Sequence, residues 1–88
     1  RPDLFYQEIS SAITIYIKKK FNNPKHAVDR KLVSEFLNDV GVPSKLVSDY
    51  SEIQNKCDLA KFAAVYGNMN EILQKTQVWL SEMEEFNS

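Results

Sequence analysis

The stretch DRKLVSEFLNDVGVPS, residues 29–44, contains a complete helix pattern together with the signal that ends it. Asp29 is a residue type that often precedes a helix, because its carboxylate accepts a free backbone N–H of the first turn. Apolar residues then recur at the spacing of one helix face: Leu32, Val33, Phe36, Leu37 and Val40. Gly41 favours the left-handed backbone that commonly follows a helix, and Pro43 comes soon after. The stretch therefore predicts a helix from Asp29 to Val40 and a tight turn into a further helix.

The preceding segment, from Asp3 to Phe21, carries an apolar stripe at helical spacing. The stripe consists of Phe5, Ile9, Ala12, Ile13, Tyr16 and Ile17, with Tyr6 beside it. The β-branched run at 13–17 is also compatible with a strand. The periodicity, however, continues through the whole segment, and three lysines at 18–20 suit the carboxyl end of a helix dipole. We therefore predict a helix.

Two further helices are expected after Pro43. Ser44 is a suitable cap for the third helix, whose inner face would carry Leu46, Val47, Tyr50, Ile53 and Cys57. Asp58 is a candidate for a fresh cap, which predicts a short extra helical segment from Leu59 to Val65. Asn68 and Glu71 have the spacing of a capping box at the start of the last helix. The expected core side of that helix is Met69, Ile72, Leu73, Thr76, Trp79, Leu80 and Met83, with Phe86 as a further candidate.

The predicted fold is all-α, a compact bundle of four main helices with a short extra helical segment between the third and fourth. A chain of 88 residues supports one domain, so residues 1–88 are expected to share a single core. One Cys and one His cannot form a zinc site or an internal disulfide, and two Gly can hardly build a phosphate-binding loop. Cys57 is expected to pack in the core, because the neighbouring Asp58 disfavours a thiolate. We expect no enzyme activity, no cofactor, no metal and no small-molecule substrate.

Charge is divided unevenly along the chain. Residues 1–34 contain seven bases and three acids (+4), whereas residues 35–88 contain four bases and nine acids (−5), giving the net charge of −1. Most of these N-terminal bases lie around the loop that is expected between the first and second helices, and we call them the basic loop region. Its candidate contact residues are Lys18, Lys19, Lys20, Lys25, His26, Arg30 and Lys31. Their partner would be an acidic protein or anionic lipid headgroups, although a solvated loop after a helix end explains the same pattern.

Two other surfaces bear on function. Leu4 and Ile15 point away from the apolar stripe at about 100° per residue, which makes them candidates for a second contact surface. The second and third helices could imitate a helix-turn-helix, but Asp49 and Glu52 on the would-be recognition helix would be repelled by phosphates. Nucleic acid is therefore not expected as a partner.

The order of these features resembles the C-terminal cytosolic domain of the BatD family, the Bacteroides aerotolerance or "oxygen tolerance" family. The resemblance covers most of the chain. The first helix begins with the aromatic pair Phe5-Tyr6, and Gly41-Val42-Pro43 follows the second helix. The most specific piece is Cys57-Asp58-Leu59-Ala60-Lys61-Phe62-Ala63, which is similar to the family's Cys-acid-x-Ala-basic-aromatic-Ala segment. The chain departs from the family in having Asp29 in place of a Thr cap, and no Pro at 64–67.

The resemblance implies a membrane-anchored parent protein with a membrane helix upstream of Arg1 and this domain on the cytoplasmic side of the inner membrane. It implies work with a MoxR-type AAA+ ATPase and von Willebrand A-domain proteins in aerotolerance and stress resistance. We therefore expect a non-enzymatic helical protein-interaction module. The alternatives are binding to an anionic membrane surface through the basic loop region, and a structural homo-oligomerisation domain that packs through Leu4 and Ile15.

Overall fold

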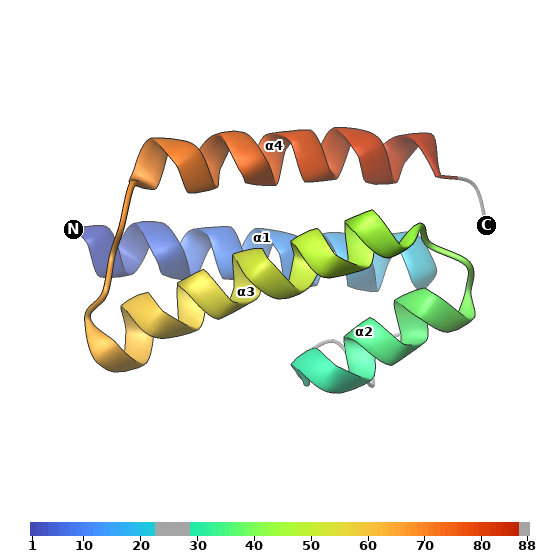
Figure 1. Ribbon diagram of the computed structural model, residues 1–88, viewed down its shortest axis with the longest axis horizontal. Coiled ribbons are helices and arrows are strands. Elements are labelled where there is room, and N and C mark those ends of the chain that lie inside the picture. Colours follow the sequence, from blue (N-terminus) through green and yellow to red (C-terminus); the bar gives the residue numbers. More distant parts are fainter. Residues whose placement is uncertain (23–28, 87–88) are drawn as a thin grey trace.

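The computed structural model describes residues 1–22 and 29–86, which form four helices and no strand (Figure 1). The helices are α1 (Pro2–Phe21), α2 (Arg30–Asp39), α3 (Ser44–Ala63) and α4 (Met69–Glu85). Helix α3 packs against each of the other three helices, and α1 also packs against α4. Helices α2 and α4 lie on opposite sides of α3 (Figure 1). The predicted all-α, four-helix bundle is confirmed.

The core is a single cluster to which all four helices contribute. Its centre is formed by Ile13, Leu37, Ile53, Trp79 and Met83, none of which is more than 1% exposed. The buried face of α1 is narrower than the predicted stripe: Tyr6, Ile9, Ile13 and Ile17 are buried, Phe5 and Tyr16 pack at the edge, and Ala12 is exposed. Burial on α1 therefore follows one side of the predicted stripe, the side on which Tyr6 and Ile17 lie.

Several apolar residues predicted to lie in the core are on the surface. Leu32, Met69 and Leu73 are 40%, 41% and 36% exposed. Each belongs to a helix whose spacing places it beside the buried residues, at the edge of the apolar face. Helix α2 packs mainly on α3, so only Val33 and Leu37 of α2 are fully buried. An edge residue is covered only where a neighbouring helix reaches it.

The helix starts predicted from short-range signals are present. The Asp29 carboxylate accepts a 3.1 Å hydrogen bond from the backbone N–H of Leu32, and the Asn68 amide oxygen accepts a 3.2 Å bond from that of Glu71. Gly41 has a φ of +92°, the left-handed conformation expected after α2. Ser44 differs from its expected role: it is the first residue of α3, and Pro43 occupies the cap position.

The predicted break at Asp58 is wrong. Helix α3 runs without interruption from Ser44 to Ala63, and no separate helical segment precedes α4 in the described part of the chain. An Asp inside a helix costs only about 0.6 kcal/mol relative to Ala. The buried series Ile53, Cys57 and Ala60 continues past it, so packing outweighs that cost. The helix ends at Ala63 and is capped by Ala64 in the left-handed conformation, and the Val65 N–H donates to the Leu59 carbonyl.

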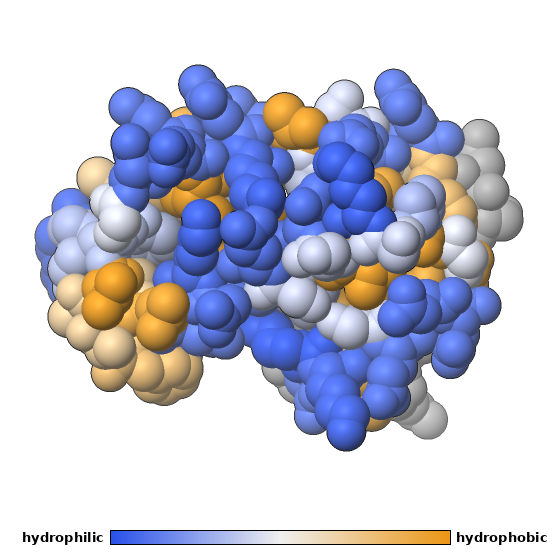
Figure 2. Space-filling model, in the orientation of Figure 1, coloured by the Kyte–Doolittle hydropathy of each residue, from blue (hydrophilic) through white to orange (hydrophobic). Residues whose placement is uncertain are grey.

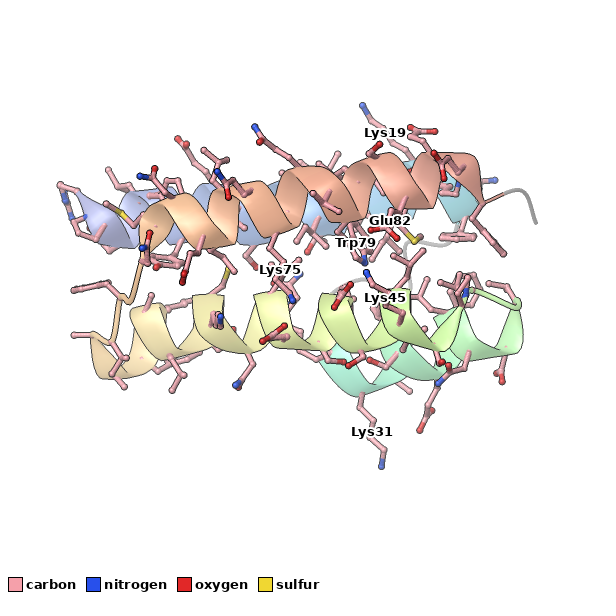
Figure 3. All side chains as sticks on the ribbon, turned by 45° about the horizontal axis from the view of Figure 1, so that its top comes forward. Lys19, Lys31, Lys45, Lys75, Trp79 and Glu82 are labelled. Carbon is pink, nitrogen blue, oxygen red and sulfur yellow. The ribbon has the colours of Figure 1, made fainter. Side chains whose placement is uncertain are left out.

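Ion pairs join the outer edges of α3 and α4 (Figure 3). Lys45 of α3 contacts Asp49 at 2.9 Å on its own helix and Glu82 of α4 at 3.4 Å. Lys75 of α4 reaches back to Asp49 at 3.4 Å and to Glu52. Burial raises the pKa of the Asp49 carboxyl, but the two lysines outweigh this effect and hold the pKa below its usual value. The network therefore favours one register of α4 along α3.

Candidate interaction surfaces

The basic residues predicted as a contact site do not share one surface in the described part of the chain. Lys18, Lys19 and Lys20 lie in the last turn of α1, with Lys19 exposed and the other two partly buried. Lys31 is exposed on α2. In Figure 3, Lys19 and Lys31 point away from opposite sides of the molecule. Lys25 and His26 lie outside the described residues.

Among the predicted contact residues that the structure describes, Arg30 is the one whose side chain is held by hydrogen-bond partners on other helices. Its Nη2 donates to Ser10 Oγ at 3.1 Å and to Asp58 Oδ1 at 3.2 Å. Ser10 Oγ in turn donates to the Gln54 side-chain oxygen at 2.8 Å. These four side chains connect α1, α2 and α3. The Arg30 guanidinium therefore serves to fasten α2 to the bundle.

The sequence does not predict this polar cluster, because its members come from three helices. One signal was present: Gln54 is three residues before Cys57 and four after Tyr50, so it falls on the inner face of α3. Gln54 is fully buried. Its amide nitrogen and the Tyr50 hydroxyl have no hydrogen-bond partner among the described residues.

A polar cleft lies beside this cluster, between α1, the start of α2 and the C-terminal half of α3. Asp3, Ser10, Arg30, Cys57 and Asp58 line it together with five neighbours. Burial, with a smaller contribution from the adjacent Asp58, raises the pKa of the Cys57 thiol to about 11 against the opposing effect of Arg30. The thiol therefore stays protonated at neutral pH and offers no activated nucleophile. The predicted inner-face position of Cys57 is confirmed, since the residue is 3% exposed.

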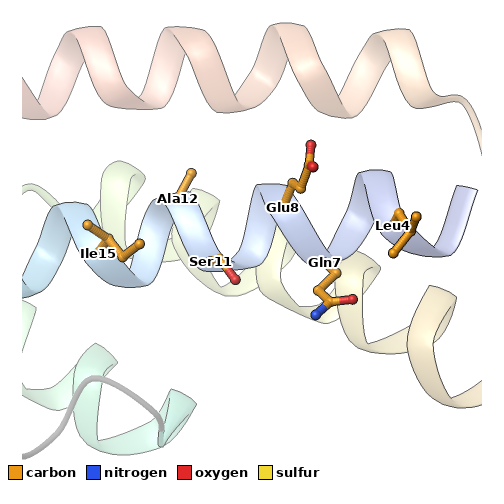
Figure 4. Close-up of a pocket in the computed structure, with 6 residues that line it drawn as sticks. All are labelled: Leu4, Gln7, Glu8, Ser11, Ala12 and Ile15. Carbon is orange, nitrogen blue, oxygen red and sulfur yellow. The ribbon is translucent and has the colours of Figure 1, made fainter.

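The outward pair on α1 lies where the helical spacing predicts. Leu4 and Ile15 are 46% and 50% exposed and stand at the two ends of a shallow depression (Figure 4). Smaller and polar side chains line the depression between them: Gln7, Glu8, Ser11 and Ala12. This face of α1 combines two aliphatic side chains with room for a side chain of another molecule.

A second apolar surface, which the sequence did not predict, lies at the end of α3. We name it the apolar tip and define it as Leu59, Phe62, Val65 and Tyr66, which are 41%, 77%, 54% and 37% exposed. Its position is visible as the orange and pale-orange area at the lower left of Figure 2. The end of α3 presents Ala60 to the core and Leu59 and Phe62 to solvent, and the connection to α4 adds the exposed Val65 and Tyr66. The sequence predicts a separate helical segment from Leu59 to Val65. Which side of these residues faces solvent follows only from the continuation of α3 to Ala63.

The fold defines the class of this protein as a small all-α bundle. In residues 1–22 and 29–86, no three His, Cys, Asp or Glu side chains are grouped to hold a metal ion, and no helix has both the length and the apolar character needed to cross a membrane. Comparisons with known proteins match the chain to no family model, no curated protein and no solved structure. Membership of the BatD family therefore stays a prediction from the sequence.

Proposed function

We propose that this domain is a non-enzymatic protein-interaction module, the cytosolic tail of a membrane-anchored, BatD-like aerotolerance and stress-resistance protein. The resemblance of the Cys57–Ala63 segment and of the helix order supports the family assignment. The observation that supports an interaction role is the outward face of α1, where Leu4 and Ile15 flank a depression. Exposed apolar side chains grouped around a depression commonly mark a contact site.

The proposed partners are a MoxR-type AAA+ ATPase and von Willebrand A-domain proteins of the Bat system. The α1 face suits a partner helix that places one apolar side chain between Leu4 and Ile15. Glu8 and Gln7 at the rim of the depression would accept or donate hydrogen bonds to polar groups of that helix. Helix α1 packs against α3 and α4 on its other side. A partner that docks on the outward face with Leu4 and Ile15 would therefore not disturb the core.

Capture of the purified ATPase or von Willebrand A-domain protein by the immobilised chain tests this proposal. The double variant Leu4→Asp/Ile15→Asp should weaken capture by about tenfold or more, because it places charge in the apolar contact. Val78→Asp on α4 is the matched control, since Val78 is 54% exposed. Equal capture by the double variant and the control would reject the α1 face.

The basic loop region is tested in the same assay. Charge reversal at Lys19 and Lys25 should reduce capture and make the remainder less sensitive to salt, if acidic groups of the partner contact these lysines. Unchanged capture would remove the basic residues from the proposal. Sedimentation of the chain alone decides the homo-oligomer alternative, because self-association through Leu4 and Ile15 would disappear in the Leu4→Asp/Ile15→Asp variant.

A further inference from the structure

We propose that the apolar tip, formed by Leu59, Phe62, Val65 and Tyr66, inserts into the interface of an anionic lipid bilayer. The tip lies on the last turn of α3 and the start of the connection to α4. It is separate from the depression on α1, and its function as a lipid contact needs no protein partner.

Exposure is the first argument. Phe62 is 77% exposed, more than any other large apolar side chain in the described residues, and Val65 is 54% exposed. Leu59 and Phe62 are one helical turn apart, and Leu59, Val65 and Tyr66 line one shared hollow, so the side chains form a continuous surface. A contiguous exposed apolar surface on a small domain usually marks a site that binds a membrane or another molecule.

The charge on the tip itself favours an anionic surface. Residues 59–70 contain one charged residue, Lys61. The acids in the hollows beside the tip are accompanied by bases: Arg1 pairs with Asp3 at 2.9 Å, Arg30 pairs with Asp58 at 3.2 Å, and Lys56 lines the same hollow as Glu71. The Lys61 ammonium lies 5.2 Å from the centre of the Phe62 ring. Insertion of that ring would bring the ammonium to the level of the headgroup phosphates, where a Lys strengthens binding to an anionic bilayer by about a few-fold.

Shape favours a bilayer over a helical partner. The tip occupies one end of the bundle, where α3 turns back toward α4 through the left-handed Ala64 (Figure 1). A partner helix needs a groove along its length, while a projecting end enters a fluid interface without one. Tyr66 stacks on Tyr6 with ring centres 6.3 Å apart and stays 37% exposed at the rim of the tip. Tyrosine is enriched at the interface between the headgroups and the hydrocarbon core of membranes, where its hydroxyl stays hydrated.

Lipid contact through the tip and lipid contact through the lysines of α1 would turn opposite ends of the bundle toward the membrane. The tip lies at the end of the bundle where α1 begins, and Lys18 to Lys20 lie at the other end of α1 (Figure 1). Contact through the tip would place Arg1 next to the lipid. That orientation suits the membrane-anchored tail proposed above, but the inference does not depend on it.

Sedimentation with lipid vesicles tests the inference on the 88-residue chain alone. We expect the chain to bind vesicles of phosphatidylcholine mixed with phosphatidylglycerol more strongly than vesicles of phosphatidylcholine. Phe62→Ser/Val65→Ser should lower the partition coefficient by about tenfold or more, and Lys61→Gln by a few-fold. Val78→Ser is the matched control, because Val78 and Val65 are equally exposed at 54%.

Three results would overturn the inference. In the first, the chain binds neither kind of vesicle. In the second, the Phe62→Ser/Val65→Ser variant binds like the unmodified chain. In the third, Lys19→Glu abolishes binding and the tip variant does not, which assigns lipid contact to the opposite end. Since no partner protein is present, these outcomes are independent of capture by the proposed partners.

Fluorescence gives a second measurement of insertion. Phe62→Trp places an indole at the tip, while the native Trp79 is 1% exposed and supplies a shielded background. Brominated lipids quench an indole that enters the bilayer, so quenching should appear in the Phe62→Trp variant and not in the unmodified chain. Equal quenching of both proteins, or of neither at saturating vesicle, contradicts insertion of the tip.

Discussion

The indole N–H of Trp79 on α4 donates a 2.9 Å hydrogen bond to the backbone carbonyl of Leu46 in the first turn of α3. The Trp79 ring also lies against two tyrosines, with centres 5.9 Å from Tyr16 of α1 and 6.2 Å from Tyr50 of α3. A single side chain therefore joins three helices, and its polar atom fixes α4 along α3 at one position.

Trp79→Phe should lower the free energy of unfolding by about 2–3 kcal/mol. The variant loses a buried hydrogen bond, worth about 1 kcal/mol, and leaves space where the larger indole packed. Urea denaturation followed by far-UV circular dichroism measures the change without depending on the lost fluorophore. Val78→Ala, at the exposed neighbouring position, should change stability by less than about 0.5 kcal/mol. Equal effects of the two substitutions would contradict a locking role for Trp79.

Asn68→Ala should destabilise the protein by about 1 kcal/mol, because the Glu71 N–H loses its 3.2 Å acceptor at the start of α4. Asn70→Ala is the matched control: Asn70 lies inside the first turn of α4 and is exposed, so Ala should be neutral or slightly stabilising there. Urea midpoints of the two variants give the comparison. A loss of stability at Asn70 as large as that at Asn68 would show that the cap is not its source.

The features predicted correctly depend on residues close together in the chain. Asp29, Gly41 and Asn68 act on backbone groups within a few residues, so the helix boundaries near them follow from local chemistry. Leu4 and Ile15 share a face because the helix period alone places them there. These predictions required no knowledge of which helices pack together.

The failed predictions involve tertiary packing. Asp58 looks like a helix start locally, but Cys57 and Ala60 are both buried, and continuing the helix is the way to bury both. The position of Ala60, three residues after Cys57, was a usable signal for this continuation. The ion pair of Asp58 with Arg30 and the exposure of Phe62 depend on where α1 and α2 lie, which no local pattern contains.

Ala64→Gly should stabilise the protein by about 0.5–1 kcal/mol. Ala64 has a φ of +53°, where a β-carbon is strained, and glycine removes that strain. Gly41→Ala is the converse experiment and should destabilise by about 1 kcal/mol: Gly41 has a φ of +92° and nothing lies within 4 Å of an added β-carbon, so the cost is in the backbone. Changes of the same sign in both variants would contradict this account.

The stability contribution of Cys57 should disappear in alkaline solution. Burial and the adjacent Asp58 raise the pKa of its thiol, Arg30 opposes them, and together these effects move the pKa from the ordinary 9.0 to about 11. The folded state therefore holds the neutral thiol at pH values where the unfolded chain has lost the proton. The contribution is complete below pH 9.0 and is lost as the pH rises toward about 11. Cys57→Ala removes this titration but keeps Tyr6, Tyr16 and Tyr50, whose pKa values are also raised by desolvation. Its unfolding free energy should therefore fall less steeply over that range in urea titrations. Parallel curves for the two proteins would show that the thiol is already solvated in the folded state.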